Sequence, residues 1–215
     1  RNYLVTCAKT LAEMPEIDAV QLDYIRQPDL ILPKGLWGNY GLDMSQYLAP
    51  YDFCYCQRCK TAYGAKPHPH DAKWIDFRLN AVAETATLLT DTIRQCGKRA
   101  GAAVFPTPKM SAAMVFQAWD RFKLDFAFPM LYAKFYEAGD AWILDCLEEG
   151  QKAVQETWGT ALYPGLHLPD YTEEELKAFL PKLLEKNPRG FCLFSHETFN
   201  TDAVRSAVKS IVKPN

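Results

Sequence analysis

Short apolar runs alternate along this chain with longer stretches in which apolar residues recur every three or four positions. The runs predict β-strands and the longer stretches predict amphipathic helices, because side chains alternate between faces along a strand and return to one face of a helix after about 3.6 residues. The strands show little alternation of polar and apolar residues, which favours parallel strands covered on both faces. Five strands are predicted, at residues 19–26, 102–106, 124–132, 161–168 and 190–195, and six helices, at 2–14, from 74, at 112–122, around 143–154, after 172 and after 201.

The helical spacing also predicts which side chains are buried. Thr172 and Glu175 have the pattern of a capping box, in which the two side chains bond the free backbone amides at a helix start. The predicted buried faces are Leu4, Ala8, Leu11 and Ala12 in the first helix, and Phe77, Ala81, Leu88 and Ile93 in the longest one.

Alternating helices and strands predict parallel β/α units in one domain. The chain opens on a helix, and five units are too few to close an eight-stranded barrel. We therefore expect an incomplete (β/α) barrel of the TIM type, covering the last five β/α units over residues 1–215, with a long loop insertion at 27–73. We expect the fragment to expose two strand edges, at 19–26 and 190–195, and apolar side chains meant for the missing units, and these would be covered by sequence upstream or by a second copy in a homodimer. The alternative is a doubly wound open sheet, but residues 27–29, Gln-Pro-Asp, are not the glycine-rich phosphate turn typical of that fold.

Composition narrows the class of partner. A hydrophobic fraction of 48%, with 13% aromatic residues, is enough for a buried core. The 24 basic and 26 acidic residues nearly cancel and form no basic cluster, so we expect no nucleic-acid partner. No apolar run approaches the roughly 20 residues of a membrane helix, so we expect no membrane partner. The seven cysteines leave the cellular compartment open.

The candidate chemistry lies at strand ends. In a parallel barrel the carboxyl ends of the strands converge on one face, whatever their separation in sequence. Asp23 stands near the end of the first predicted strand among apolar neighbours, where a carboxylate needs a partner or a ligand. The structural alternative is an ion pair between Asp23 and Arg26 that shapes the loop. Asp125 begins its strand, so we place it on the opposite face and exclude it.

Several motifs occur in an order that resembles a known group of proteins. The segment DAVQLDYIRQPD at 18–29 is similar to the strand motif of hypothetical glycoside-hydrolase barrel families. YDFCYCQRCKTAYG at 51–64 is similar to their cysteine-rich loop, WIDFRLNAV at 74–82 to one of their helices, and AAVFPTP and LDFAFPMLY to their later strands. The resemblance implies a (β/α)8 barrel that acts on carbohydrate, with Asp23 as the acidic residue at the end of the fourth strand. Only this resemblance favours a periplasmic or extracellular location for the protein.

Glycoside hydrolysis usually requires two carboxyl groups. Glu197 is the predicted partner of Asp23, as general acid; its alternative role is to satisfy the amino terminus of the last helix. The predicted substrate-binding residues are Tyr24, Arg26, Tyr132, His167 and His196. For His167 the alternative is a hydrogen-bonded residue at a strand end, and Asp170 lies close to the same face. Other aromatic residues could present flat surfaces to a sugar, namely Trp37, Phe105 and Tyr136.

The insertion at 27–73 is far longer than a usual β/α connection, so we expect it to form a wall of the site. Within it, Cys54, Cys56 and Cys59 bring three thiols together, with His68, His70 or Asp71 as candidates for a fourth zinc ligand. Three thiols are only part of a zinc framework, so a disulfide or buried free thiols are favoured, and no metal and no cofactor are predicted.

The predicted function is a glycoside hydrolase that cleaves an oligosaccharide or polysaccharide, with Asp23 as nucleophile or base. The first alternative is a noncatalytic carbohydrate-binding or scaffold barrel that has lost one acid. The second is a metal-dependent hydrolase that uses His68 and His70, which lie in a loop without matching later ligands.

Overall fold

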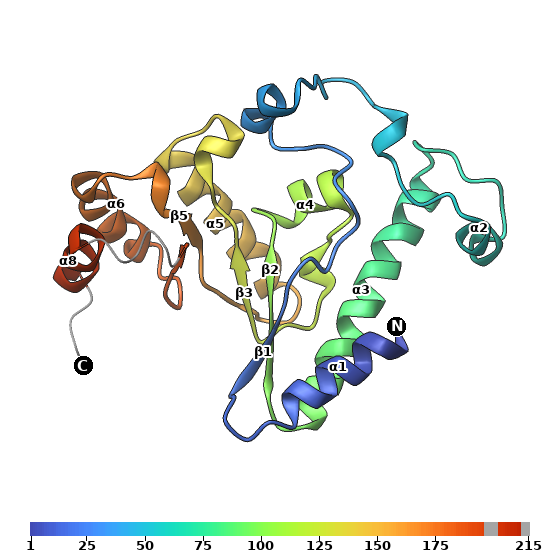
Figure 1. Cartoon of the computed structure of the whole chain (residues 1–215), viewed down its shortest axis with the longest axis horizontal. Coiled ribbons are helices and arrows are strands. Elements are labelled where there is room, and N and C mark those ends of the chain that lie inside the picture. Colours follow the sequence, from blue (N-terminus) through green and yellow to red (C-terminus); the bar gives the residue numbers. More distant parts are fainter. Residues whose placement is uncertain (196–201, 212–215) are drawn as a thin grey trace.

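The computed structural model describes residues 1–195 and 202–211 and shows a mixed α/β chain whose strands pair in parallel (Figure 1). One sheet has four strands in the order β1-β2-β3-β4, and β5 pairs with β6. A parallel bridge between Met130 and Gly165 links the two sheets, so neighbouring strands follow the order of the chain. The described strands do not close into a barrel. Their bounds are β1 Ala19–Leu22, β2 Arg99–Val104, β3 Phe126–Pro129, β4 Ala161–Leu162, β5 Gly165–His167 and β6 Cys192–Phe194.

The strand predicted at 161–168 is two short strands, β4 and β5, separated by Tyr163 and Pro164. Proline has no backbone N–H, so it cannot continue the ladder of β4. Tyr163 N donates to Ala127 O at 2.9 Å, whereas the carbonyl of Pro164 accepts from Cys192 N at 2.9 Å. The chain thus passes at this point from pairing with β3 to pairing with β6.

The helices flank the strands. Figure 1 shows α1 and α3 side by side next to β1 and β2, with α6 and α8 at the opposite side of the molecule. No helix in the described parts of the chain is long and apolar enough to cross a membrane. The α-helices are α1 Asn2–Ala12, α2 Gln57–Tyr63, α3 Ala72–Gln95, α4 Pro108–Val115, α5 Asp140–Gln155, α6 Glu173–Glu185 and α8 Asp202–Ile211, and the 3-10 helices are η1 Lys34–Tyr40, η2 Ala49–Tyr51, η3 Trp119–Arg121, η4 Ala133–Tyr136 and η5 Leu168–Asp170.

The helix predicted at 112–122 is replaced by α4 and η3, because Phe116 adopts a left-handed conformation (φ 53°) and ends α4. The short helix α2, inside the insertion, was not predicted. The capping box of α6 is confirmed: Thr172 Oγ1 accepts from Glu175 N at 3.2 Å, and Glu175 Oε2 accepts from Thr172 N at 2.8 Å.

Among the described residues, one face of the four-stranded sheet packs against helices and the other is open, so the two covered faces expected from the strand composition are not both present, whereas the exposed apolar side chains expected of an incomplete barrel are. Side chains on the buried face pack against α3, α5 and α6 in the main core. On the other face, Gln21 is exposed and Phe126 and Phe128 are only partly buried. The rings of Phe126, Phe128 and Tyr163 contact one another there. This alternation was missed because the open face carries aromatic and small residues, which resemble core residues in the sequence.

Two helices bury only part of the face that was predicted for them. In α1, Ala8 and Ala12 are buried as predicted, but Leu4 and Leu11 are exposed. In α3, Ile93 is buried and Leu88 is exposed, because the packed face is displaced toward Val82, Ala86 and Leu89. Small residues allow both helices to approach the sheet closely, so alanine rather than leucine occupies much of the contact.

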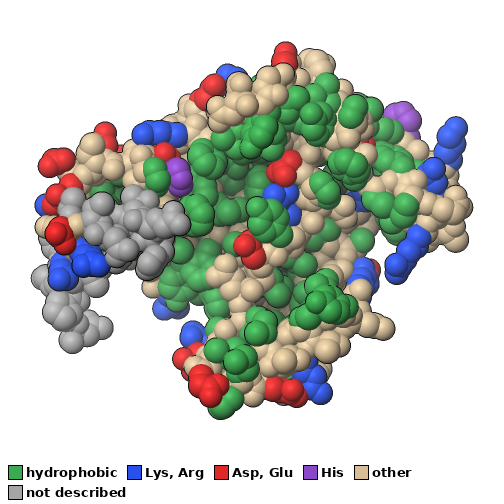
Figure 2. Space-filling model, in the orientation of Figure 1, with side chains coloured by type: hydrophobic (Ala, Val, Ile, Leu, Met, Phe, Trp, Pro, Cys, Tyr) green, Lys and Arg blue, Asp and Glu red, His purple; other side chains and the backbone are tan. Residues whose placement is uncertain are grey.

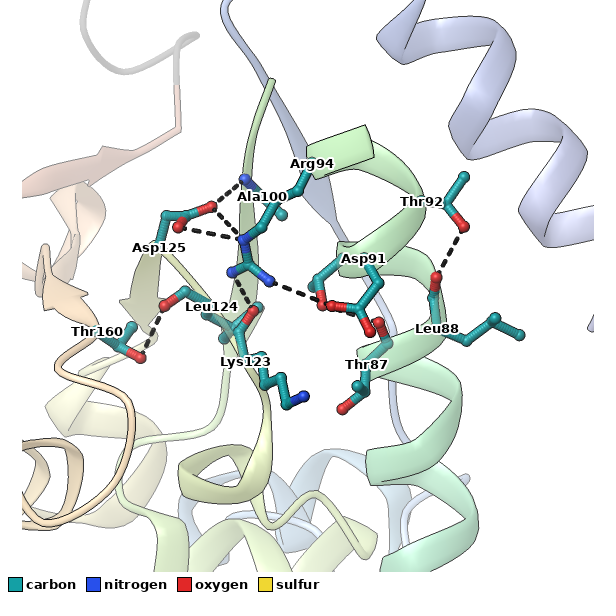
Figure 3. Close-up of polar contacts among 11 residues, drawn as sticks. Thr87, Leu88, Asp91, Thr92, Arg94, Ala100, Lys123, Leu124, Asp125 and Thr160 are labelled. Carbon is teal, nitrogen blue, oxygen red and sulfur yellow. Dashed lines mark hydrogen bonds and ion pairs between the residues drawn. The ribbon is translucent and has the colours of Figure 1, made fainter. Parts of the chain in front are cut away.

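Polar contacts join the amino ends of the strands (Figure 3). Asp125, directly before β3, accepts from Ala100 N of β2 at 2.7 Å and pairs with Arg94 Nε at 3.3 Å. Thr160 Oγ1, directly before β4, donates to Leu124 O at 3.0 Å. Asp125 therefore lies at the edge opposite to the carboxyl ends, where the sequence placed it.

The insertion crosses over the carboxyl ends of the strands (Figure 1). Its first part is tied to α4, because Gln27 N and Leu30 N donate to the carbonyls of Val115 and Met114. Its later part is fixed to α3 by an ion pair between Asp52 and Arg78, both of which are buried.

Candidate functional site

A cavity of about 360 Å³ lies at the carboxyl ends of β1, β2 and β3, beneath the start of the insertion. Parallel strands bring these ends to one edge, and the period of two along a strand turns Asp23, Ala103 and Met130 toward the open face. Figure 2 shows hydrophobic side chains gathered across the middle and upper part of the molecule in this view, with a few acidic and basic ones among them. The aromatic residues lining the cavity are Tyr24, Phe105, Tyr132, Phe135, Tyr136 and Phe194, and the charged ones are Asp23, Arg26 and Asp29.

Asp23 lies at the rim of this cavity with its side chain exposed. Its Oδ1 accepts from the backbone N of Tyr24 at 2.8 Å. Tyr24 has a positive φ of 51°, which turns the chain directly after Asp23. Within the described part of the chain, the carboxylate has no ion pair and no further hydrogen bond, so its lone pairs remain available to a ligand.

Arg26 pairs with Asp29 rather than with Asp23, so the alternative of an Asp23–Arg26 ion pair is wrong. Its NH1 lies 3.0 Å from Asp29 Oδ2 and donates to Gln27 O at 3.0 Å. The turn at Tyr24 separates Arg26 from Asp23, and Asp29 comes within reach three residues later. The guanidinium also lies 4.9 Å from the ring centre of Tyr24 and 5.2 Å from that of Phe105. Arg26 thus holds two aromatic walls of the cavity together.

Tyr132 forms another wall. Its ring stacks on Phe194 with centres 5.6 Å apart. Burial raises the pKa of its hydroxyl, and electrostatic interactions with Cys192 and Asp23 raise it further. Tyr132 is therefore a neutral hydrogen-bond donor at ordinary pH, next to the carboxylate of Asp23.

His167 is not among the residues that line the cavity. Its ring lies 5.3 Å from that of Tyr132, and its Nδ1 is 2.9 Å from Asp170 Oδ1. It thus matches the alternative given by the sequence, a hydrogen-bonded residue at a strand end. Its ring packs against Tyr132 outside the cavity. Glu197 and His196 lie outside the described residues.

Gln117 lines the cavity and was not predicted. It is 1% exposed, and its Oε1 accepts from Phe105 N at 2.8 Å. Its Nε2 donates to Ile25 O at 3.3 Å. The side chain thus joins the segments that follow β1 and β2, and nothing in the local sequence VFQAW distinguishes it from an ordinary loop glutamine.

The outer part of the insertion depends on Asp52, whose role was also missed. Its Oδ1 accepts from Arg78 NH1, and its Oδ2 accepts from the hydroxyls of Tyr47 at 2.9 Å and Tyr55 at 2.7 Å. Burial raises the pKa of Tyr47, and the hydrogen bond to Asp52 raises it further. The loop motif at 51–64 and the helix motif at 74–82 therefore meet in one buried polar network.

The three clustered cysteines lie in the same part of the insertion. Their Sγ atoms all lie within 4.8 Å of one another, and those of Cys54 and Cys59 are 3.6 Å apart. The backbone N–H of Cys59 lowers the pKa of Cys56 to about 7, with help from the other two thiols, whereas burial raises the pKa of Cys59 to about 12.

The candidate fourth ligands do not join this cluster. Asp71 caps α3 through Lys73 N and accepts from the hydroxyl of Tyr63. His68 accepts from the backbone of His70, and neither histidine belongs to the thiol cluster.

The cavity thus combines a free carboxylate, a neutral phenol and aromatic walls at the carboxyl edge of a parallel sheet, an arrangement suited to a ligand with flat apolar faces and polar edges. Comparison with protein-family models and with curated protein sequences finds no match to this chain.

Proposed function

We propose that the cavity binds a carbohydrate and that the chain is a glycoside hydrolase with Asp23 at its reactive centre. The observation that carries the proposal is the unpaired carboxylate of Asp23 at the rim of a cavity lined by six aromatic side chains. A sugar ring presents C–H groups on its faces and hydroxyls at its edges, so aromatic walls and a few polar groups match both. The resemblance of residues 18–29 to a glycoside-hydrolase strand motif supports the same assignment.

We further propose that the sheet belongs to a (β/α) barrel. All described strands are parallel and follow chain order, as in a barrel wall. One face of the sheet is open and carries Phe126, Phe128 and Tyr163, and β1 forms an edge of the sheet. In a closed barrel such a face is the interior. Further strands, or a second copy of the chain, would cover it.

Within this proposal Asp23 acts as nucleophile or general base, and Glu197 supplies the proton to the leaving oxygen. The second carboxylate in the cavity, Asp29, forms an ion pair with Arg26, so we assign it a structural role in the cavity wall. The hydroxyl of Tyr132 is a neutral donor that could hydrogen-bond a sugar hydroxyl near Asp23. The separation of the two catalytic carboxyl groups decides the stereochemical outcome, at about 5–5.5 Å for retention and about 6.5–9.5 Å for inversion.

The alternative is a noncatalytic carbohydrate-binding domain. It is favoured by one observation: among the described residues, Asp23 is the only carboxylate lining the cavity without an ion pair. Both candidates require sugar binding, and only the hydrolase requires turnover.

The test is to measure binding and hydrolysis of a panel of oligosaccharides and aryl glycosides by the protein and by Asp23→Asn, Glu197→Gln and Asp43→Asn. Asp43 is an exposed carboxylate of the insertion outside the cavity and serves as the matched control. The hydrolase predicts that each of the first two variants loses about 100- to 10,000-fold in turnover while Asp43→Asn does not. Binding without turnover would support the noncatalytic domain. Unchanged turnover in Asp23→Asn would exclude Asp23 from the chemistry, and absence of binding to every sugar would contradict both candidates.

A further inference from the structure

The segment at 52–64 has almost no hydrophobic core of its own. Asp52 is its only buried residue, and the helix α2 within it buries none. Polar contacts to α3 and the ring of Tyr63 against Trp74 hold it in place. Segments with so little buried apolar surface commonly depend on a covalent or metal cross-link.

The three thiols of this segment are arranged around a common point. All three Sγ atoms fall within 4.8 Å of one another, and the Cys54–Cys59 pair is 3.6 Å apart. Tetrahedral zinc with Zn–S bonds of about 2.3 Å places its sulfur ligands about 3.8 Å apart. The observed spacing therefore needs only small side-chain adjustments to receive a metal ion.

A disulfide accounts for this arrangement less well than a metal does. A disulfide joins two sulfurs and leaves the third without a function, although all three converge. The seven cysteines are all free in the structure. The sequence also brought the three thiols together, but it favoured a disulfide or buried thiols because three thiols are only part of a zinc framework; the structure adds the distances between the three sulfurs.

We propose that Cys54, Cys56 and Cys59 bind one zinc ion through three thiolates, with a water molecule as the fourth ligand, and that this ion stabilises the outer wall of the insertion. Each thiol releases its proton when it coordinates. No other Cys, His, Asp or Glu of the described chain joins the three, which leaves the fourth position to solvent. The site is independent of the sugar cavity.

The test uses the whole chain, reduced, freed of metal by a chelator, and then supplied with zinc or cobalt alone. We expect one equivalent of zinc to remain through gel filtration, and cobalt to give the near-ultraviolet charge-transfer band of thiolate ligands. Replacing any one of the three cysteines with Ser should weaken zinc binding by more than the roughly 10- to 100-fold that loss of an outer-shell partner costs. Cys96→Ser, a partly buried free cysteine at the end of α3, is the matched control and should bind zinc normally.

Because a cysteine variant could fail to fold, a second measurement uses the unaltered protein. Zinc should protect Cys54, Cys56 and Cys59 from alkylation, as mapped on peptides, while leaving Cys7 and Cys96 as reactive as before. The proposal is overturned if zinc is not retained, if it protects no thiol of the cluster, if the triple Ser variant binds it equally, or if the isolated protein carries a reducible Cys54–Cys59 bond.

Discussion

A few individual side chains decide how the insertion and the cavity are held, and each has at least one partner far away in sequence. Asp52 and Arg78 are 26 positions apart and both are buried. Gln117 reaches Ile25 across 92 positions. Local patterns predict burial and secondary structure, but they contain no information on such pairings, which is why neither contact was predicted.

Replacing Arg78 with Ala should lower the free energy of unfolding by about 3–5 kcal/mol, because it leaves the carboxylate of Asp52 buried without its cation. Arg121→Ala is the matched control, since Arg121 pairs with Asp76 at 2.9 Å on the surface. That pair should contribute only about 0–1 kcal/mol. Denaturant unfolding of the two variants measures both values, and equal losses would contradict the assigned burial.

The thiol of Cys56 should react at a lower pH than that of Cys59 in reduced, metal-free protein. A pKa lowered to about 7 means that the thiolate of Cys56 forms as the pH rises through about 7, whereas Cys59, with a pKa raised to about 12, stays protonated there. Because the thiolate is the nucleophile, alkylation of Cys56 should increase between about pH 6 and about pH 8 while that of Cys59 remains slow. Mass mapping of peptides follows each site, and equal rates would contradict the expectation.

At the scale of elements, small residues determine how closely the strands and helices approach one another. Gly101 of β2 lies under the ring of Phe126 of β3, and a Cβ at this position would overlap that ring. In the same way, Ala8 and Ala12 bring α1 close to β1 and α3. Leucine-rich stripes are therefore poor guides to the buried faces here.

We expect Gly101→Ala to destabilise the protein by about 1–3 kcal/mol through overpacking against Phe126. Combining it with Phe126→Leu should recover part of this loss, because a smaller side chain then faces the new methyl group. Thermal or denaturant unfolding of the two single variants and the double variant would show the coupling. Strictly additive effects would mean that the two positions do not touch.

The orientation of α1 can be tested with a pair of charge substitutions. Leu11→Lys should change the free energy of unfolding by no more than about 0.5 kcal/mol, because Leu11 is 47% exposed. Ala8→Lys should be severely destabilising, because Ala8 is 5% exposed and has no anionic partner in its cluster. Severe destabilisation by both substitutions would restore the face predicted from the sequence, which included Leu11 as well as Ala8.

At the scale of the whole molecule, the alternation of strands and helices was enough to predict a parallel sheet in chain order, and thus to predict that its carboxyl edge is the place for a site. Asp23, Tyr24, Arg26 and Tyr132 do meet at one cavity there. The division of the fourth strand at Pro164 and the partner of Arg26 could not be predicted, because each depends on which segments meet in space. Whether further strands close the sheet into a barrel stays a prediction.

The insertion contacts the packed interior of the molecule through very few side chains. Of residues 27–71, only Leu30 and Ile31 pack against buried hydrophobic clusters, and neither belongs to the main core. Elsewhere the loop is held by backbone hydrogen bonds at its base, by contacts of η1 with η4, by the ion pair of Asp52, and by the rings of Tyr55 and Tyr63 against Trp74. Because none of its residues belongs to the main core, a segment attached in this way can change in length or sequence without repacking that core. Related chains could therefore acquire new ligand preferences by replacing this loop alone. The two ends of the insertion are also suitable points at which to substitute another loop.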